Sequence, residues 1–572
     1  MRTMRPSALT GDRHRWMPRQ QEELEMVVVD TEVDVLIVGA GPVGLTARAL
    51  LHRWGVRAMV VERYGELSPF PRSRLVNVRS MEIFRQLGLA APIAHRAFAP
   101  KFGRIRFRDT LLGDDYASAG MVGINAPIPQ SPLIGVVTSQ DRLEPALLAA
   151  PGAPVRYGVE LVDLAEDSDG VVASLVDHRD GAHSHVRARY VLAADGANST
   201  VRQRLGIGTA GPGAVGRMAT VVFDADLHRW SDDQPAGVYA TRHGSFLPLY
   251  PEGGWAWLVP APEDTERADW PGLLAAALGA GMGAGVGADV RPEVLRVQHW
   301  VVNAFVAERF GHGRVLLAGD AAHAIPPAGG LGMNVGIADV HNLCWKLAAV
   351  LHGWADPGLV HTYEPERHPV AQENLRQAVV NAQLMFQVQS GRGDPSRDGG
   401  AQPDQVELPW SEQYFAQLGL VLGVAYRSAA VRPGDGTAPE PAGGTDYVPT
   451  AAPGHRMPHA WLTDGRSTLD ALGEWFTLLT PAPAEWTRPT DGPWPLRVET
   501  LPGEHAALFG LGEQGAVLVR PDGHVGARWP AGPPGDAALP DALAAITCSG
   551  AARAGAVAPV GELRGSGSGR RR

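Results

Sequence analysis

The sequence predicts an α/β protein in which a Rossmann-like dinucleotide-binding domain is interleaved with a β-rich domain. Two observations predict the first domain: a glycine-rich turn between a short apolar strand and a helix, and a buried strand much later in the chain that ends on Asp320. A third observation, several short apolar runs between residues 218 and 310, predicts the β-rich domain. At 572 residues the chain is too long for one hydrophobic core.

The first unit of the dinucleotide-binding domain has the order strand, turn, helix, strand. The apolar run 33–38 is typical of a buried parallel strand, and segments 45–54 and 58–61 have the patterns of a helix and a second strand. The turn after the first strand is Gly39-Ala40-Gly41-Pro42-Val43-Gly44. Glu62 ends the second strand, where its carboxylate can accept hydrogen bonds from a ribose diol.

Each glycine of this turn has a physical role. Gly39 permits the tight turn, Gly41 lets the backbone approach a pyrophosphate, and Gly44 lets the helix pack closely on the strand. The helix N-terminus then presents N–H groups to the phosphates. We expect Arg63, next to Glu62, to contact the cofactor as well. The sequence therefore predicts a dinucleotide site at this turn.

Composition excludes several other classes. The net charge of −10 provides no basic field for nucleic acid or anionic lipid. Neither lysine, Lys101 nor Lys346, follows a glycine, so the chain has no phosphate-binding P-loop. Cys344 and Cys548 form no CxxC pair, and no HExxH cluster is present, so we expect no metal.

Targeting signals are also missing from the sequence. The first thirty residues are polar and arginine-rich and lack the apolar segment of a secretory signal. The longest uncharged stretch, 270–288, is mostly Ala and Gly with a proline inside it, so we expect no membrane helix. We therefore expect a cytoplasmic location. Gly279–Ala284 has a similar glycine spacing but no preceding strand, which predicts a loop rather than a second dinucleotide site.

Further motifs resemble those of a known family, the para-hydroxybenzoate hydroxylase and phenol hydroxylase family of FAD-dependent aromatic-ring monooxygenases. The resemblance covers roughly residues 33–385. It rests on these segments: the second flavin fingerprint Gly313–His323 with Ile325–Asn334, the DG motif Tyr190–Arg202, Pro71-Arg72, and Gln140 with Leu143-Glu144.

The resemblance implies FAD as the cofactor. A carboxylate at Asp320 would accept a hydrogen bond from a ribityl hydroxyl, and Arg72 would meet the FAD pyrophosphate or incoming NADPH. The cofactor contacts expected on this basis are Gly39, Gly41, Gly44, Glu62, Arg63, Arg72, Gln140, Asp195, Asp320, Gly332, Met333 and Asn334. No catalytic side chain is identified, and His323 is not assigned as a base. The loop expected to bring backbone N–H groups to the flavin N1 and C2 carbonyl edge contains Pro327, Gly329, Gly330, Gly332, Met333 and Asn334.

The resemblance also implies a reaction. In the family NADPH reduces FAD, O2 adds at flavin C4a, and the resulting peroxide or hydroperoxide passes one oxygen to an aromatic substrate. The substrate would lie between the flavin domain and the middle domain, where Phe246, Tyr250, Trp255 and Trp257 either line a pocket or form the core.

The C-terminal segment resembles the thioredoxin-like domain of phenol hydroxylase and of actinobacterial polyketide hydroxylases, on Pro453–His459 and Gly515–Gly523. Without CxxC it lacks thioredoxin redox chemistry, and we expect a structural or homodimer-forming role. This domain, the arginine bias and the length together are most similar to bacterial aromatic polyketide hydroxylases of the tetracenomycin or angucycline type, which act in antibiotic biosynthesis.

Three alternatives remain open from the sequence. A Baeyer–Villiger oxygenase would share every flavin motif. A flavin-dependent halogenase is suggested by Gly254–Pro260, which resembles its GWxWxIP signature, and would need Lys101 as its lysine. A flavin-binding scaffold without turnover is the third.

The expected domain boundaries follow from these motifs and from two Gly- and Pro-rich stretches, 390–405 and 433–444. They are a disordered extension 1–30, an FAD-binding domain 31–217 and 311–400 with part of the substrate region near 100–135, a substrate-binding middle domain 218–310, a thioredoxin-like domain 445–560 and a disordered tail 561–572.

Overall fold

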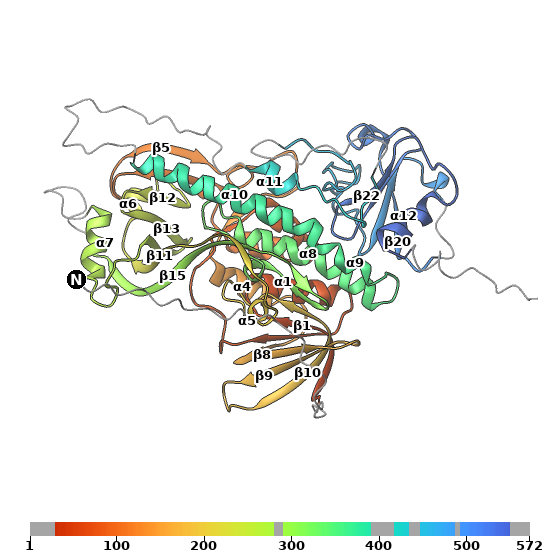
Figure 1. Cartoon of the computed structure of the whole chain (residues 1–572). Coiled ribbons are helices and arrows are strands. Elements are labelled where there is room, and N and C mark those ends of the chain that lie inside the picture. Colours follow the sequence, from red (N-terminus) through yellow and green to blue (C-terminus); the bar gives the residue numbers. More distant parts are fainter. Residues whose placement is uncertain (1–28, 280–289, 391–416, 434–446, 487–491, 550–572) are drawn as a thin grey trace, which may run out of the picture.

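A computed structural model describes residues 29–279, 290–390, 417–433, 447–486 and 492–549 (Figure 1). The expected tail 561–572, nearly all of the extension 1–30, and most of the two Gly- and Pro-rich stretches lie outside these residues, as does the loop after Gly279. Among the helices described, none combines the length and apolarity that crossing a bilayer requires.

The first sheet contains the strands predicted around the glycine-rich turn. Its main path runs in the order β16 (Gly311–His312), β17 (Val315–Leu317), β10 (His183–Ala193), β1 (Thr31–Val38), β2 (Ala58–Glu62) and β7 (Val155–Tyr157). From β17 to β7 neighbouring strands are parallel. An antiparallel pair, β9 (Val171–Asp177) and β8 (Val159–Glu166), extends β10 on one side. The predicted strands at 33–38 and 58–61 and the predicted buried strand before Asp320 are confirmed.

Helices cover this sheet and follow its strands. The glycine-rich turn leads into α1 (Pro42–Arg53), which packs against α4 (Gln140–Leu148) and α8 (Gly332–Leu351). Nearly all of α8 is buried, including polar residues such as Asp339 and Lys346 that have partners within the protein. It begins at Gly332, directly after the glycine-rich loop. The other helices of this part are α2 (Val78–Gln86), α3 (Ala90–Arg96), α5 (Thr200–Arg204), α9 (Gly358–His361) and α10 (Tyr363–Ser390).

A second sheet, mostly antiparallel, lies beside the first (Figure 1). Its order is β18 (His323–Ala324), β15 (Glu293–Ala307), β11 (Thr209–Asp224), β14 (Gly253–Pro260), β13 (Gly244–Tyr250), β12 (Val238–Thr241), β4 (Arg104–Arg108) and β5 (Asp115–Gly120). Only β12 and β4 pair in parallel. The long strands β11 and β15 pair along most of their length.

The aromatic residues of the second sheet form a core beneath α7 (Trp270–Leu278). Phe246 stacks on Trp257 with ring centroids 5.9 Å apart, and both belong with Trp255 to a cluster that includes Leu274 and Leu278 of α7. Of the two readings left open by the sequence, core packing therefore holds for these three rings. The other face of the sheet is aliphatic and carries Val222, Leu247, Leu249 and Ala256.

Smaller elements complete the described chain. A third sheet has the order β20 (Leu496–Thr500), β19 (Phe476–Thr480), β21 (Ala516–Val519) and β22 (Val525–Trp529), and α12 (Ala538–Ile546) packs against it. A two-stranded ribbon joins β3 (Leu75–Val76) and β6 (Val136–Val137). The remaining elements are α6 (His228–Ser231), α11 (Leu418–Leu422), and the 3-10 helices η1 (Pro100–Phe102), η2 (Gly319–Ala321), η3 (Pro483–Glu485) and η4 (Gly503–His505).

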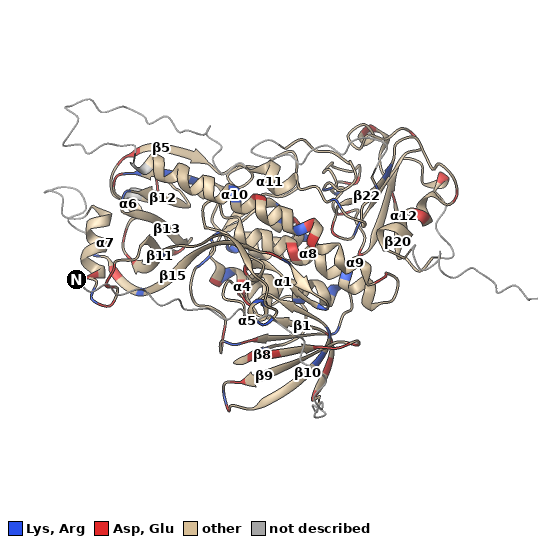
Figure 2. Cartoon of the chain, viewed as in Figure 1, with Lys and Arg blue, Asp and Glu red and all other residues tan. Residues whose placement is uncertain are grey.

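Buried charges join the C-terminal part to the helices of the first sheet. Acidic and basic residues gather where α8 and α10 approach the third sheet (Figure 2). Glu366 of α10 accepts hydrogen bonds from Arg520 at 2.7 and 2.9 Å and from Lys346 of α8 at 2.7 Å. All three side chains are fully buried. Burial lowers the pKa of Lys346 to about 8, against the opposing effect of Glu366.

A second buried group joins the same part to α2. Glu82 pairs with Arg79 at 3.0 Å and with Arg456 of the C-terminal part, whose Nε donates at 2.9 Å. Arg79 also donates to the backbone oxygen of Asp522 at 2.8 Å. Because removing one partner of a buried pair leaves an uncompensated charge, these contacts hold the C-terminal part firmly against α2.

We expect Arg520→Met to destabilise the protein by about 3–5 kcal/mol, because it leaves the carboxylates of Glu366 and Asp522 buried with too few partners. Denaturant unfolding followed by tryptophan fluorescence measures this loss. Arg466→Met, at an exposed pair with Asp464, is the matched control and should change stability by less than about 1 kcal/mol. Equal, small effects in both variants would contradict the role of the buried pairs.

Candidate cofactor and substrate site

Four of the expected site residues lie at the same edge of the first sheet. Gly39 follows β1, Glu62 ends β2, Asp195 follows β10 and Asp320 follows β17. These strands are adjacent and parallel, with Val38 paired to both neighbouring strands. In open α/β sheets, ligands bind outside the carboxyl ends of the strands. The fold therefore brings together residues that are far apart in sequence at the edge where a dinucleotide would bind.

The glycine-rich turn has the geometry expected of its three glycines. Gly39 has φ +101°, and a Cβ there would lie 2.4 Å from the carbonyl oxygen of Ala194. A Cβ on Gly44 would lie 2.0 Å from the Gly39 oxygen. Gly41, by contrast, has no heavy atom within 4 Å of its Cβ position and stands at the N-terminus of α1. Packing requires the first and third glycines, and the second leaves open space for a phosphate.

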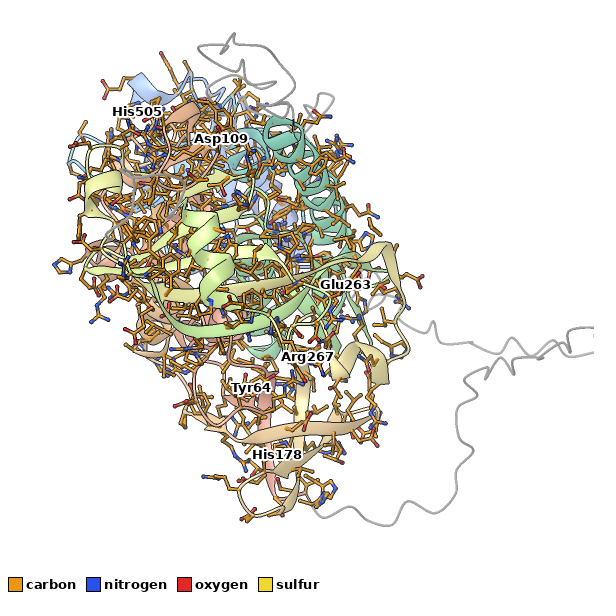
Figure 3. The ribbon with its side chains drawn as sticks, turned by 90° about the vertical axis from the view of Figure 1, so that its left-hand side faces the viewer. Tyr64, Asp109, His178, Glu263, Arg267 and His505 are labelled. Carbon is orange, nitrogen blue, oxygen red and sulfur yellow. The ribbon has the colours of Figure 1, made fainter. Side chains whose placement is uncertain are left out.

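Glu62 lies at the carboxyl edge of the first sheet and is hydrogen-bonded to the glycine-rich turn. Its carboxylate accepts hydrogen bonds from the backbone N–H of Ala40 at 2.8 Å and of Tyr64 at 3.0 Å. Arg63 is exposed, and its guanidinium lies 4.9 Å from the ring centroid of Tyr64, a surface side chain labelled in Figure 3. Glu62 is thus fixed at the edge, whereas Arg63 lies against a surface ring.

The carboxylate of Asp320 is accessible to solvent at the surface of the edge, but many protein atoms lie around it and displace water. The resulting desolvation raises the pKa of Asp320, while the charges of His323 and Arg72 act in the opposite direction. Arg72 is exposed and its charge also acts on Glu144. An accessible carboxylate with a nearby arginine fits the expected ribityl and pyrophosphate contacts.

Gln140 and Glu144 form a buried pair behind Arg72. The Gln140 amide oxygen accepts from the backbone N–H of Ser73 at 3.2 Å, and its nitrogen donates to Glu144 at 2.7 Å. Burial raises the pKa of Glu144 to about 7, with Gln140 and Arg72 opposing. The sequence marked Glu144 only as matching a family position, because its burial depends on tertiary packing.

The glycine-rich loop before α8 delivers a helix N-terminus to this edge. Gly329 and Gly330 have φ +105° and +66°, and α8 then begins at Gly332. The first α-helical hydrogen bond at this end runs from Val335 to Leu331, so the N–H groups of Gly332 and Met333 precede the helical ladder. An anionic edge of a ligand would be stabilised there.

The side chain of Asn334 is occupied within the protein. Its oxygen accepts from the Asn77 backbone at 2.9 Å and from the Ser80 hydroxyl at 2.7 Å. Its nitrogen donates to the carbonyl oxygens of Leu75 at 2.8 Å and Gly330 at 2.7 Å. A flavin contact from Asn334 must therefore come from its backbone N–H.

A buried cluster of His323, Asp339 and Arg367 packs next to η2, which carries Asp320. His323 and Asp339 are joined by a 2.6 Å hydrogen bond, and Arg367 donates to Asp339 at 2.8 Å. Burial alone would raise the pKa of Asp339, but His323 and Arg367 together lower it. His323 is fully buried, which agrees with a supporting role rather than that of a base. Nearby, the carboxylate of Asp195 accepts from the Val201 backbone at 3.2 Å, and burial raises its pKa.

An apolar cavity of about 510 Å³ opens between α2, α3 and β6. Its lining combines small Ala and Gly residues with larger apolar ones such as Phe98, Val136 and Val137, and includes Arg85. Ile124 lines both this cavity and a small recess at Gly329 and Gly330. A cavity of this size can hold a polycyclic ligand. The described residues contain no group of three potential metal ligands.

Comparison with known proteins identifies the family. Residues 32–378 match the FAD binding domain, and residues 450–549 match the C-terminal domain of aromatic-ring hydroxylases. This chain belongs to the FAD-binding aromatic-ring hydroxylases. It is an FAD-dependent aromatic monooxygenase with a mixed α/β fold.

Curated relatives match along nearly their whole length. The chain is 33% identical to 4-methyl-5-nitrocatechol 5-monooxygenase of Burkholderia sp, over 91% of this chain and 98% of the relative. It is 34% identical to tetracenomycin B2 monooxygenase-dioxygenase of Streptomyces olivaceus, over 87% and 95%. A similar solved structure is the flavin-dependent monooxygenase PieE in complex with FAD and substrate, with TM-score 0.81, 34% identity, and coverage of 91% and 100%.

We expect Glu62→Ala and Asp320→Ala each to weaken FAD binding by about 1.5–3 kcal/mol, because each removes a charged hydrogen-bond acceptor from the edge. Flavin fluorescence during titration of the apoprotein measures the affinity. Glu66→Ala, at an exposed position, serves as the control and should bind FAD normally. Normal affinity in both site variants would place the cofactor elsewhere.

Glu144 should make stability depend on pH. Because burial raises its pKa from 4.5 to about 7, the folded protein keeps this proton between those values while the unfolded chain releases it. Stability from this group is therefore lost as pH rises through that window, by at most about 3 kcal/mol.

We accordingly expect Glu144→Gln, which cannot ionise, to unfold at a higher temperature than the unmodified protein at pH 8 and at nearly the same temperature at pH 5. Thermal unfolding of the FAD-free proteins tests this, with Glu66→Gln as the exposed control. A difference that does not grow with pH would contradict the buried, protonated carboxyl.

Proposed function

We propose that this chain is an NADPH- and O2-dependent monooxygenase that hydroxylates a polycyclic aromatic polyketide of the tetracenomycin or angucycline type. The observation that supports the proposal is the position of the cofactor edge beside the second sheet: η2, which carries Asp320, contacts β18, and Tyr250 of β13 donates a hydrogen bond to Asp141 of α4. By their names, one relative acts on tetracenomycin B2 and another on 4-methyl-5-nitrocatechol, and the names of two more contain the words polyketide hydroxylase. The cavity of about 510 Å³ favours the larger of these substrate types.

The residues at the edge fit FAD. Gly41 and the N-terminus of α1 would receive the pyrophosphate, Glu62 the adenosine ribose and Asp320 the ribityl chain. The N–H groups at the start of α8 would meet the C2 carbonyl edge of the ring. When bound, FAD supplies the redox chemistry, taking a hydride from NADPH and activating O2 for transfer to an aromatic carbon.

The protein's own contribution is position and the exclusion of water. The aliphatic face of the second sheet carries Leu247 and Leu249, and Tyr250 at the end of β13 donates a hydrogen bond to Asp141 of α4, which joins this sheet to the helices of the first. An apolar wall next to the cofactor edge excludes water from the reacting atoms. Gly329 and Gly330, at positive φ, give the adjoining loop a backbone that other residues would not readily adopt.

The structure offers no support for a halogenase. Lys101 is an exposed residue of η1 and lies over the ring of Phe102, 5.6 Å from its centroid. Trp255 and Trp257 of the GWxWxIP-like segment belong to the core beneath α7. Ring hydroxylation therefore remains the proposed reaction, and a Baeyer–Villiger product is the outcome that the test below distinguishes.

We propose that the C-terminal domain is a thioredoxin-like fold without redox chemistry. Its four-stranded sheet has one parallel and two antiparallel pairings. Of the two cysteines, Cys344 lies buried in α8 and Cys548 follows α12, so no dithiol pair exists in the chain.

We expect NADPH oxidation by the enzyme alone to be slow and to accelerate markedly when the true aromatic substrate is added, because reduced flavin without substrate wastes NADPH. Anaerobic stopped-flow reduction measures this step, and 18O2 labelling with NMR of the product distinguishes a new hydroxyl group from a ring-expanded lactone. A lactone would overturn hydroxylation. If NADPH reduced the flavin equally fast with and without a substrate that the enzyme hydroxylates, the proposed acceleration by substrate would be wrong, but the proposed hydroxylation would stand.

A further inference from the structure

The guanidinium of Arg74 is buried without a hydrogen-bond partner. Its Nε and both terminal nitrogens are inaccessible to solvent, and no described residue accepts a hydrogen bond from them. The group lies 5.6 Å from the ring centroid of Phe98. Burial lowers the pKa of Arg74 to about 10, with Asp141 and Tyr250 opposing. Because a buried charged group without partners is costly, such a group indicates a ligand.

Two more buried polar atoms near Arg74 lack partners. The hydroxyl of Ser139 and one carboxylate oxygen of Asp141 have none, while the other oxygen of Asp141 accepts from Tyr250. The backbone N–H of Thr138 donates to the Arg74 oxygen at 3.0 Å, which places the start of α4 beside Arg74. Polar atoms able to bind a ligand thus gather where α4 meets the second sheet.

This group of atoms lies next to the loop before α8 that contains Gly329 and Gly330. Leu75, next to Arg74, accepts a hydrogen bond from Asn334 and packs against Gly330. Arg72 instead acts on Asp320 and Glu144, on the cofactor side. The two arginines, only two residues apart, therefore serve different regions.

We propose that Arg74 binds an ionised oxygen of the aromatic substrate, a carboxylate or a phenolate, with Ser139 as an additional donor. The unpartnered oxygen of Asp141 then accepts a hydrogen bond from a substrate hydroxyl. This inference rests on the proposed function, since it specifies which aromatic compounds the site accepts. Phe98 links the charge to the apolar cavity: its ring contacts the Arg74 guanidinium and also lines the cavity, so an aromatic ring in the cavity would lie next to the buried charge.

A phosphate oxygen of FAD or NADPH offers the same chemistry to a guanidinium. The test therefore measures four affinities. The affinity for FAD is measured on the apoprotein; the affinity for NADPH, by anaerobic flavin reduction, and those for two probes, by the change in flavin absorbance, are measured on the holoenzyme. The probes are 1,8-dihydroxyanthraquinone and its 3-carboxylate, which differ only in the anionic group.

The variants are Arg74→Met, which removes the charge, and Arg74→Lys, which keeps the charge but lacks the planar guanidinium that can donate two parallel hydrogen bonds. The matched control is Arg267→Met, at a surface arginine labelled in Figure 3 whose side chain is 90% exposed. We expect the unmodified enzyme to bind the carboxylate about ten- to a hundredfold more tightly than the neutral probe. Arg74→Met should abolish this preference, Arg74→Lys should keep part of it, and FAD and NADPH affinities should not change.

Several results would overturn the inference. Equal binding of the two probes by the unmodified enzyme would do so without any variant, so the test does not depend on the folding of Arg74→Met. Weakened FAD or NADPH binding in Arg74→Met, with the probe preference intact, would assign Arg74 to the cofactor and leave the proposed function standing. Failure of both probes to bind would contradict the proposed substrate class and with it this site.

Discussion

The side-chain amide of Asn334 joins three segments on which the flavin edge depends. Through four hydrogen bonds it connects the N-terminus of α8 to the carbonyl of Gly330, to Leu75 of β3 and to Asn77 and Ser80 at the start of α2. All donors and acceptors of the amide are used, so the loop, the ribbon and both helices are fixed relative to one another. Loss of this amide would free the helix N-terminus that we propose contacts the flavin ring.

Helix α2 connects the segments fixed by Asn334 to the C-terminal part. Its N-terminal end is held by Asn334, and further along Arg79 and Glu82 pair with each other and with Arg456 and the backbone of Asp522. The C-terminal part therefore helps to hold the elements around the flavin edge rather than standing apart from them. Its buried ion pairs add little net stability when intact, but each is costly to break, which favours one fixed arrangement.

The sequence was sufficient where the determinants are local. Gly39 and Gly44 follow from the spacing of a strand, a turn and a helix, and the structure shows the close approaches that exclude a Cβ there. Glu144 and Arg74 could not be recognised in the same way, because their burial depends on segments distant in sequence. The sequence also could not predict whether Trp255 lies in the core or in a pocket. Alternation along a strand defines two faces, but it does not say which face a helix such as α7 covers.

We propose that the carboxyl ends of β2, β1, β10 and β17 hold FAD with its ring directed to the second sheet. A crystal structure of the holoenzyme with a bound polycyclic aromatic ligand tests it most directly. We predict the adenosine ribose at Glu62, the ribityl chain at Asp320, the ring's C2 carbonyl at the N-terminus of α8, and the aromatic ligand in the cavity that Phe98 and Val137 line, next to β4 of the second sheet. An aromatic ligand bound away from the second sheet, or FAD bound at another edge, would contradict the account.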